Sequence, residues 1–214
     1  MSEESQAYKL ANWIINKAIE GVPPIFESAE ELAEEYLDDD TYENNDERVD
    51  DLIEWEATKS FTSGFVTSLG GILTLPVSVP SALGASWVIQ ARMIAAIAII
   101  YGHNIRKDKV RTLVLLALLG DSIKEPLKDV GVKVGSKVTE KIITKIPGRV
   151  IKEINKKAGF RLLTKAGEKG IINLTKSIPV VGGIISGSFD YYYCRKVGYI
   201  AKDIFRKKSF FFRN

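Results

Sequence analysis

Apolar residues recur at three- and four-residue steps near the start of the chain, a spacing typical of helices that bury one face. This pattern predicts a helix over residues 6–20, a short helix that begins at Ser28, and a third helix capped by Asp46. Ser28 and Glu31 have the spacing of a capping box, in which each side chain binds the other residue's backbone N–H. Gly21–Pro24 ends the first helix, because its prolines cannot donate backbone hydrogen bonds.

A nearly uncharged stretch follows, since residues 60–105 contain one formal charge, Arg92. Its first part, residues 64–80, is rich in Gly, Ser, Thr and Pro, and its second part, Ser81–Tyr101, predicts a long apolar helix. That helix has the roughly 20 apolar residues that a membrane span needs, but an arginine at the bilayer centre costs at least about 2.5–3.5 kcal/mol. A central core helix is therefore favoured, and entry of residues 64–105 into a bilayer is the alternative.

The region after Gly120 predicts a basic amphipathic helix. Apolar residues from Ile123 to Ile142 form one stripe, and lysines recur at four- to five-residue steps beside it, although Pro126 and two glycines weaken the helix. Such helices can lie on anionic membrane surfaces, whereas a solvated lysine face on a core helix is the alternative. The candidate membrane or partner contacts in this row are Lys124, Lys128, Lys133, Lys137 and Lys141.

The last third of the chain predicts two further helices and a basic, aromatic tail. Pro147 can start the first of these helices, which the glycines at 159, 167 and 170 should keep short. The tail can anchor at a membrane interface, because its cations attract acidic lipid and its rings partition there; a frayed terminus is the alternative. Its candidate contact residues are Arg206, Lys207, Lys208, Phe210, Phe211 and Phe212.

The charge balance hides a strong asymmetry along the chain. The 214 residues carry a formal net charge of +3, but residues 1–60 carry a net −14 and residues 61–214 a net +17. We expect the acidic head to pair with the basic body, because a body of that charge would repel itself. The predicted organisation is acidic helices over residues 1–60 that pack on the body, an apolar and basic helical body over 61–205, and the tail over 206–214.

Rare residues limit the chemistry. A single cysteine, Cys194, excludes disulfides within the chain and multi-cysteine metal sites, and fits a reducing compartment. The first residues lack the pattern of a secretory signal. His103 has no histidine partner, and no nucleotide or zinc-protease motif is present, so no catalytic, cofactor-binding or metal-binding residue is predicted. Nucleic acid is not expected as a partner, because the lysine row lacks interleaved aromatic residues.

An enzyme of unknown reaction is a further alternative to a binding protein. Polar groups lie beside apolar segments at Arg92, His103, Asp121 and Asp190, the last of which precedes three tyrosines. Buried polar groups can be functional, although they more often satisfy each other's hydrogen bonds in a core. A closed cavity on which several of these residues converge would favour an enzyme.

Four long segments resemble the bacterial EcsC protein family. They are residues 63–76 (SGFVTSLGGILTLP), residues 90–120, residues 154–170 (INKKAGFRLLTKAGEKG) and residues 178–190 (IPVVGGIISGSFD). The resemblance covers nearly the whole chain, apart from residues 38–47 and the tail. Its motif positions imply backbone turns and close packing rather than catalysis. These are Gly64, Gly70, Gly71, Pro76, Arg92, Gly102, Gly120, Gly159, Gly170, Pro179, Gly182, Gly183, Gly187 and Asp190.

The resemblance also carries an expectation about function. The name-giving member of the family is encoded with an ABC-type transporter, and the family's members look membrane-associated. The sequence thus predicts an all-α fold, a single compact multi-helix domain with a long apolar central helix and turns rich in glycine and proline. We expect a non-enzymatic protein without cofactors that acts peripherally at the cytoplasmic face of a bacterial membrane. An acidic lipid surface and a membrane or transporter protein are its expected partners; a soluble helical interaction domain without membrane contact is the alternative.

Overall fold

A computed structural model describes residues 3–61, 76, 81–133, 138, 140–175 and 182–206. Across these ranges the regular elements are helices and there is no strand, which confirms the expected all-α fold. The helices are α1 (Glu3–Glu20), α2 (Ala29–Leu37), α3 (Asn45–Phe61), α5 (Ser81–Ile100), α6 (Asp108–Ala117), the 3₁₀ helix η1 (Gly120–Lys124), α7 (Glu125–Asp129), α8 (Glu140–Thr144), α9 (Gly148–Thr175) and α10 (Gly182–Phe205).

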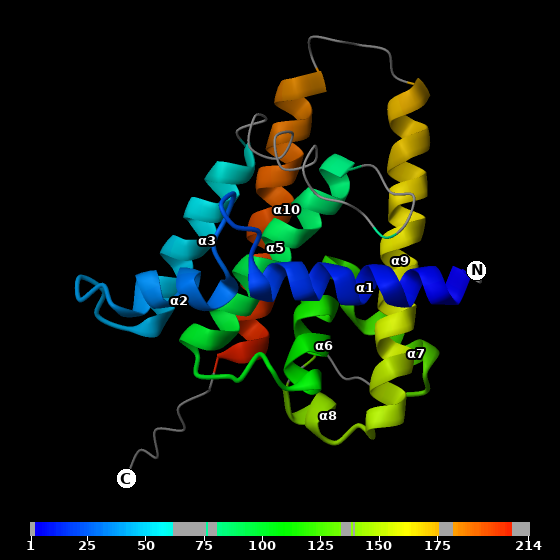
Figure 1. The fold of residues 1–214 in the computed structure, drawn as a ribbon, viewed down its shortest axis with the longest axis horizontal. Helices are drawn as coiled ribbons and strands as arrows, with labels where there is room; N and C mark the ends of the chain where they lie inside the picture. Colours follow the sequence, from blue (N-terminus) through cyan, green and yellow to red (C-terminus); the bar gives the residue numbers. More distant parts are fainter. Residues whose placement is uncertain are drawn as a thin grey trace.

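Helix α5 forms the centre of the domain (Figure 1). Helices α1, α2, α3, α6 and α10 all contact it. Among the described residues it is the one helix whose length and composition would allow it to cross a membrane, and 89% of its Leu83–Ile100 segment is buried within the protein. The expected long apolar central helix is therefore present, and its apolar side chains are covered by its neighbours.

The N-terminal helices belong to the same core as the rest of the chain. Leu10 and Ile14 of α1, Leu32 of α2 and Leu52 of α3 are completely buried in one cluster with residues of α5, α6, α9 and α10. Ser28 and Glu31 form the predicted capping box at the start of α2. Hydrophobic burial, rather than charge alone, therefore holds the acidic head on the body.

Helix α9 crosses α1 very closely, and a glycine makes the crossing possible. A Cβ added to Gly159 would lie 2.0 Å from the carbonyl oxygen of Ala7, well inside van der Waals contact. The prediction that glycines would keep this helix short is wrong, since α9 runs for 28 residues. Tertiary packing offsets the roughly 1 kcal/mol by which glycine disfavours a helix relative to alanine.

The continuous basic helix predicted after Gly120 is not formed. The chain instead makes η1 and α7, turns, and resumes as the short helix α8. Gly120 and Gly131 have φ angles of +63° and +77°, a left-handed conformation that interrupts a helix at each point. Pro126 lies at the start of α7, the position in a helix where proline is tolerated. The lysines of this region therefore do not share one helical face.

Candidate functional site

Arg92, the one charge of the apolar stretch, lies at the centre of the protein and is 1% exposed. Its Nη2 donates to both carboxylate oxygens of Glu56 on α3, at 3.1 Å each. Its Nη1 donates to Glu27, in the loop before α2, at 2.9 Å, and the guanidinium lies 5.2 Å from the centre of the Phe26 ring. The acidic N-terminal region therefore supplies the counter-charges that a buried arginine requires.

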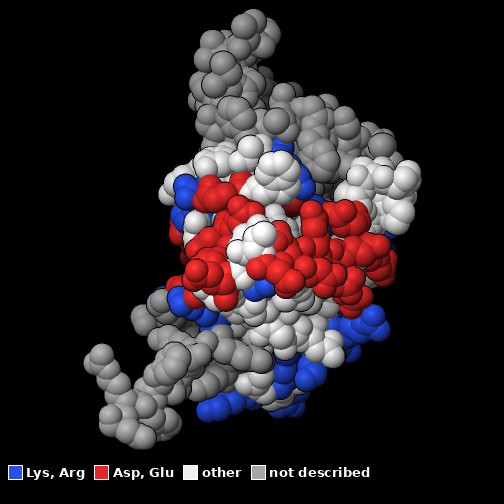
Figure 2. Space-filling model, turned by 90° about the vertical axis from the view of Figure 1, so that its left-hand side faces the viewer, with Lys and Arg blue, Asp and Glu red and all other residues white. Residues whose placement is uncertain are grey.

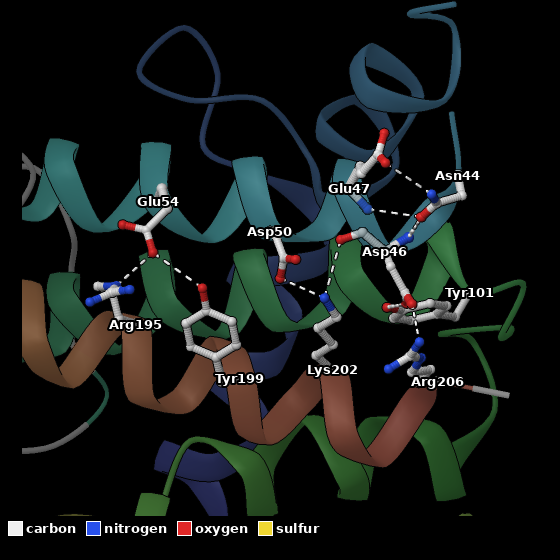
Figure 3. A network of polar contacts seen from close by, with 10 residues as sticks. All are labelled: Asn44, Asp46, Glu47, Asp50, Glu54, Tyr101, Arg195, Tyr199, Lys202 and Arg206. Carbon is white, nitrogen blue, oxygen red and sulfur yellow. Dashed lines mark hydrogen bonds and ion pairs between the residues drawn. The ribbon is translucent and has the colours of Figure 1, made fainter. Parts of the chain in front are cut away.

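A ladder of polar contacts joins α3 to α10 (Figure 3). Carboxylates spaced four residues apart on α3 face basic and tyrosine side chains on α10. The pairs are Glu54 with Arg195 and Tyr199, Asp50 with Lys202, and Asp46 with Arg206. The Arg195 Nε to Glu54 Oε1 distance is 2.6 Å, and the Lys202 Nζ to Asp50 Oδ1 distance is 2.5 Å. Much of the basic charge of α10 is thus neutralised by the head.

Asp46 joins three helices at the end of this ladder (Figure 3). Besides pairing with Arg206, it accepts a hydrogen bond from the hydroxyl of Tyr101, just after α5, at 2.6 Å. The pKa of Tyr101 is raised, mainly by burial and to a smaller extent by this hydrogen bond. The predicted capping role of Asp46 is wrong: Asn44 Oδ1 accepts from the backbone N–H groups of Asp46 and Glu47, at 2.9 and 3.1 Å.

The outer side of α2 and the loop before α3 form what we call the acidic face. It consists of Glu34, Glu35, Asp38, Asp40 and Glu43. These side chains are exposed and make no ion pair with another described residue. Figure 2 shows acidic side chains as a broad band across this side of the molecule. Arg48, the base nearest in sequence, instead donates to the backbone carbonyls of Tyr36 and Asp39.

Basic side chains collect at the end of the molecule where α6 and α9 begin, and we call this the basic end. It consists of Arg106, Lys107, Lys109, Lys145, Arg149 and Lys152. It lies at the bottom of Figure 1, and Figure 2 shows basic side chains along the lower edge, below the acidic band. Arg106 pairs with Glu30 at 3.3 Å, whereas Lys107, Lys145 and Arg149 are exposed and have no ion pair within the described ranges.

An open hollow of about 490 Å³ lies at the basic end. Residues 106–110 line one side and Thr144 the other. The Nζ atom of Lys109 donates to the carbonyl oxygen of Thr144, which fixes the start of α6 against the end of α8. Three basic side chains and one acid, Asp108, line the hollow, so it presents a mainly cationic surface.

A model of the EcsC protein family matches residues 7–209. The chain belongs to the EcsC family. The resemblance seen in the sequence motifs is thereby confirmed, over nearly the full length of the chain. Neither the curated proteins nor the solved structures gave a match. The match includes the acidic helices, the ladder and the basic end, so all of these charged features lie within the EcsC region.

The contact residues predicted for this EcsC chain are spread over several elements. Lys124 ends η1 and is partly exposed, Lys128 lies on α7, and Lys133 follows the turn after α7, the last two being exposed. Arg206 is turned toward Asp46, although its side chain remains 55% exposed. The side chains of Lys137 and Lys141, with Lys207, Lys208, Phe210, Phe211 and Phe212, lie outside the described part of the structure.

Several of the EcsC motif glycines and prolines that the structure describes lie at turns or at a tight helix crossing. Gly102 and Gly120 have positive φ angles, Gly159 lies at the α1–α9 crossing, and Pro76 is in an exposed bend. Helix α9 contains Gly170, and α10 contains Gly182, Gly183, Gly187 and Asp190, whose side-chain surroundings lie outside the description. Gly64, Gly70, Gly71 and Pro179 fall outside the described residues altogether.

The polar groups considered for an enzyme are engaged separately. His103 Nε2 lies 2.7 Å from the carbonyl oxygen of Phe205, and Asp121 pairs with Lys196. Tyr193 donates to the carbonyl oxygen of Leu118 at 3.0 Å, and burial, with a smaller effect of Asp121, raises its pKa to about 12. Arg92 is held in the core. Within the described residues these groups do not converge on one cavity.

The basic end is a surface that the sequence pattern did not indicate beside the predicted lysine row and tail. The sequence pattern did not group the run from Arg106 to Lys109 with Lys145, Arg149 and Lys152. Two signals were available: the second group borders the helix start predicted at Pro147, and neither segment is rich in acids. Their proximity could not be predicted, because it depends on how α8 packs against α6.

Proposed function

We propose that this EcsC-family chain is a non-enzymatic helical protein that binds peripherally to the cytoplasmic face of a bacterial membrane. The observation that carries the proposal is the separation of surface charge: Lys107, Lys145 and Arg149 of the basic end have no counter-charge among the described residues, while the acidic face lies on another side of the molecule. Anionic lipid attracts such a surface by about 1 kcal/mol for each basic residue near it.

The position of α5 supports contact at the surface rather than insertion. Its apolar side chains are covered by the surrounding helices, and its arginine is paired with Glu56 and Glu27. Moving α5 into a bilayer would expose the core of the domain and separate a buried ion pair, which costs several kcal/mol when one partner is removed. Electrostatic binding requires neither change.

Sedimentation with lipid vesicles tests this proposal. The full chain is expected to bind vesicles that contain acidic lipid at low salt, and to be released as the salt concentration rises. It is expected not to bind vesicles that contain zwitterionic lipid alone. No binding to acidic vesicles even at low salt would overturn it. Binding that resists high salt and needs detergent for release would indicate insertion instead.

A role as an accessory to a transporter or another membrane protein is a finer part of the proposal. It is supported by family membership and by two oppositely charged surfaces on one small domain, one for lipid and one for a partner. Crosslinking in native membranes, followed by identification of the attached protein, tests it. Recovery of lipid adducts alone would remove the partner from the proposal.

A soluble interaction domain without membrane contact is the second candidate function, and the burial of α5 favours it. Fractionation of the native protein separates the candidates. Salt-extractable protein in the membrane fraction supports peripheral binding, and protein wholly in the soluble fraction at low salt supports the second candidate.

A further inference from the structure

We propose that the basic end is the surface that meets anionic lipid headgroups, and that it orients the domain with the acidic face away from the bilayer plane. This inference rests on the proposed membrane function and names the surface that performs it. The predicted lysine row and the residues beyond Arg206 are then not the primary contact.

Two separate parts of the chain form the basic end. The loop between α5 and α6 contributes Arg106 and Lys107, the loop between α8 and α9 contributes Lys145, and the first turn of α9 contributes Arg149. Contact between Lys109 and the carbonyl oxygen of Thr144 holds the two loops together. Segments about 40 residues apart in the chain thus form one surface at one end of the molecule (Figure 1).

The two segments that form the basic end contain many more bases than acids. Residues 102–109 contain three bases and one acid, Asp108, and residues 144–152 contain three bases and no acid. Lys107, Lys145 and Arg149 are exposed and have no ion pair among the described residues. Arg195 and Lys202 of α10 and Arg206, the residue after α10, differ in this respect, because they are paired with the carboxylates of α3.

The direction of the helices adds to this charge. Both α6 and α9 begin at the basic end, so the positive ends of their dipoles lie there. Lys107, the residue before α6, makes no side-chain capping bond, and Pro147 before α9 has no side chain that can accept one. The first backbone N–H groups of α6 and α9, which have no partner within their helices, therefore add to the positive potential of the side-chain cations over a short range.

The amino-acid composition of the basic end favours a lipid surface over nucleic acid as its binding partner. Residues 102–109 and 144–152 contain no Phe, Tyr or Trp on which bases could stack. Neither loop offers a long exposed helix of the kind that enters a duplex groove. The acidic face on the adjoining side would repel any long polyanion that wrapped around the domain, whereas a flat bilayer touches one end only.

A pair of triple variants with equal net charge tests the inference. K107Q/K145Q/R149Q removes three exposed bases from the basic end, and K124Q/K128Q/K133Q removes three from the predicted row. The first variant is expected to bind acidic vesicles at low salt at least tenfold more weakly than the unchanged chain, since each basic residue contributes about fivefold. The second should lose less than about threefold. Circular dichroism and thermal unfolding confirm that both variants fold.

Four other outcomes would contradict the inference, and one of them would also contradict the proposed function. Equal losses in the two variants would overturn the inference and leave peripheral binding by net charge in place. A loss in the row variant alone would place the contact on η1 and α7 and also overturn it. If the unchanged chain binds no acidic vesicle, the proposed function fails together with the inference. Binding to short duplex DNA that exceeds binding to vesicles would identify the end as a nucleic-acid surface and overturn it too.

Orientation is tested by a fluorophore attached to single introduced cysteines. Gly148 has open space around its Cβ position, so G148C places a probe at the basic end, and E35C places one on the acidic face. The native Cys194 is completely buried and will not compete for the label. A polarity-sensitive probe should brighten and shift to the blue on acidic vesicles in G148C only. An equal response in both variants would show that the domain has no fixed orientation.

Discussion

Among the described residues Arg92 has an unusual environment, because it is one of the largest fully buried side chains and is charged. Its bidentate contact with Glu56 and its contact with Glu27 tie α5 to the acidic head. Buried ion pairs often add little net stability over apolar residues of similar volume, but they are costly to break. We therefore expect Arg92 mainly to determine which surface of α3 faces α5, and to add little to the free energy of unfolding.

Replacing Arg92 alone is predicted to destabilise the domain strongly. R92M leaves the buried carboxylate of Glu56 without its main counter-charge, so the free energy of unfolding should fall by about 3–5 kcal/mol. R92M/E56L, which removes both charges, should be more stable than R92M. Urea unfolding of the two variants measures this, and a double variant less stable than R92M would contradict it.

Tyr193 provides a pH-dependent prediction. Its hydroxyl binds the Leu118 carbonyl oxygen, and its pKa is raised to about 12 from an ordinary value near 10. The stability that this group contributes is full below pH 10 and is lost as the pH rises from 10 toward 12, because the unfolded chain ionises first. Tyr193→Phe should cost about 0.5–1.5 kcal/mol at pH 8 and about 1 kcal/mol less at pH 11.

Denaturant unfolding of both proteins at the two pH values measures the Tyr193 effect. Tyr192→Phe is the control, since Tyr192 is 63% exposed, and should change stability by less than about 0.5 kcal/mol at either pH. A cost of Tyr193→Phe that is the same at pH 8 and pH 11 would contradict the prediction.

At the scale of elements, the crossing of α1 and α9 depends on one glycine. Gly159→Ala would force a methyl group into the backbone of α1 at Ala7. Overpacking of this kind costs about 1–3 kcal/mol. Gly148→Ala, in the first turn of the same helix with open space around it, should be neutral or slightly stabilising. Thermal unfolding compares the two, and equal stability of both variants would show that the helices can separate without cost.

The ladder between α3 and α10 gives a prediction that depends on salt. D46N/D50N/E54Q removes the three carboxylates, and its melting temperature at low salt should fall by about 2–4 °C. The difference in melting temperature between the variant and the unchanged chain should shrink in 1 M salt, because screening weakens the ion pairs of the unchanged chain. The matched control E34Q/E35Q/D40N removes three acids that lack ion pairs in the described structure, and should lose no stability. A deficit that salt does not change would assign the effect to packing.

Much of the architecture could be predicted at this scale, because it depends on local patterns. Periodic apolar residues indicated α1 and α3, the Ser28–Glu31 spacing indicated the start of α2, and the uncharged stretch indicated a central helix. The break at Gly131 agrees with the weakening that Pro126 and the glycines indicated, and it uses the left-handed conformation that glycine adopts freely. The length of α9 could not be predicted, because it depends on tertiary packing, such as the α1–α9 crossing, that overrides glycine propensity.

The candidate site was less predictable than the fold for the same reason. The lysine row was a local pattern, and it assumed a continuous helix that the chain does not form. The basic end arises from loops that are distant in sequence, and Arg206, which looked like a free cation, is paired with Asp46 from the head. Which bases stay unpaired is decided by packing between the two ends of the chain.

At the scale of the whole molecule, charge is separated rather than cancelled. Among the described residues, the head pairs with bases of α10 and with the core arginine and carries exposed acids on the acidic face, while exposed bases gather at the basic end. A small net charge therefore coexists with separated surface charges, on which the field of an anionic surface would act in opposite directions.

Neutralising the acidic face is predicted to change membrane affinity in the opposite direction to neutralising the basic end. E34Q/E35Q/D40N removes repulsion from an acidic bilayer, so affinity at low salt should rise by up to a few fold, with no change near 0.15 M salt, where charges more than about 8 Å apart are screened. Vesicle titrations at the two salt concentrations measure this. A tenfold weaker binding of the variant would mean that the acidic face itself contacts the vesicle.

The pairing of the chain's beginning with its end has a consequence for synthesis. Glu54 meets Arg195 across 141 residues, and α1 packs on α9 near the other end of the chain. Such distant contacts close large loops and slow folding relative to other helical proteins. On the ribosome, α1 and α3 emerge long before α9 and α10, so the apolar surfaces that α9 and α10 cover stay exposed until these helices have been made.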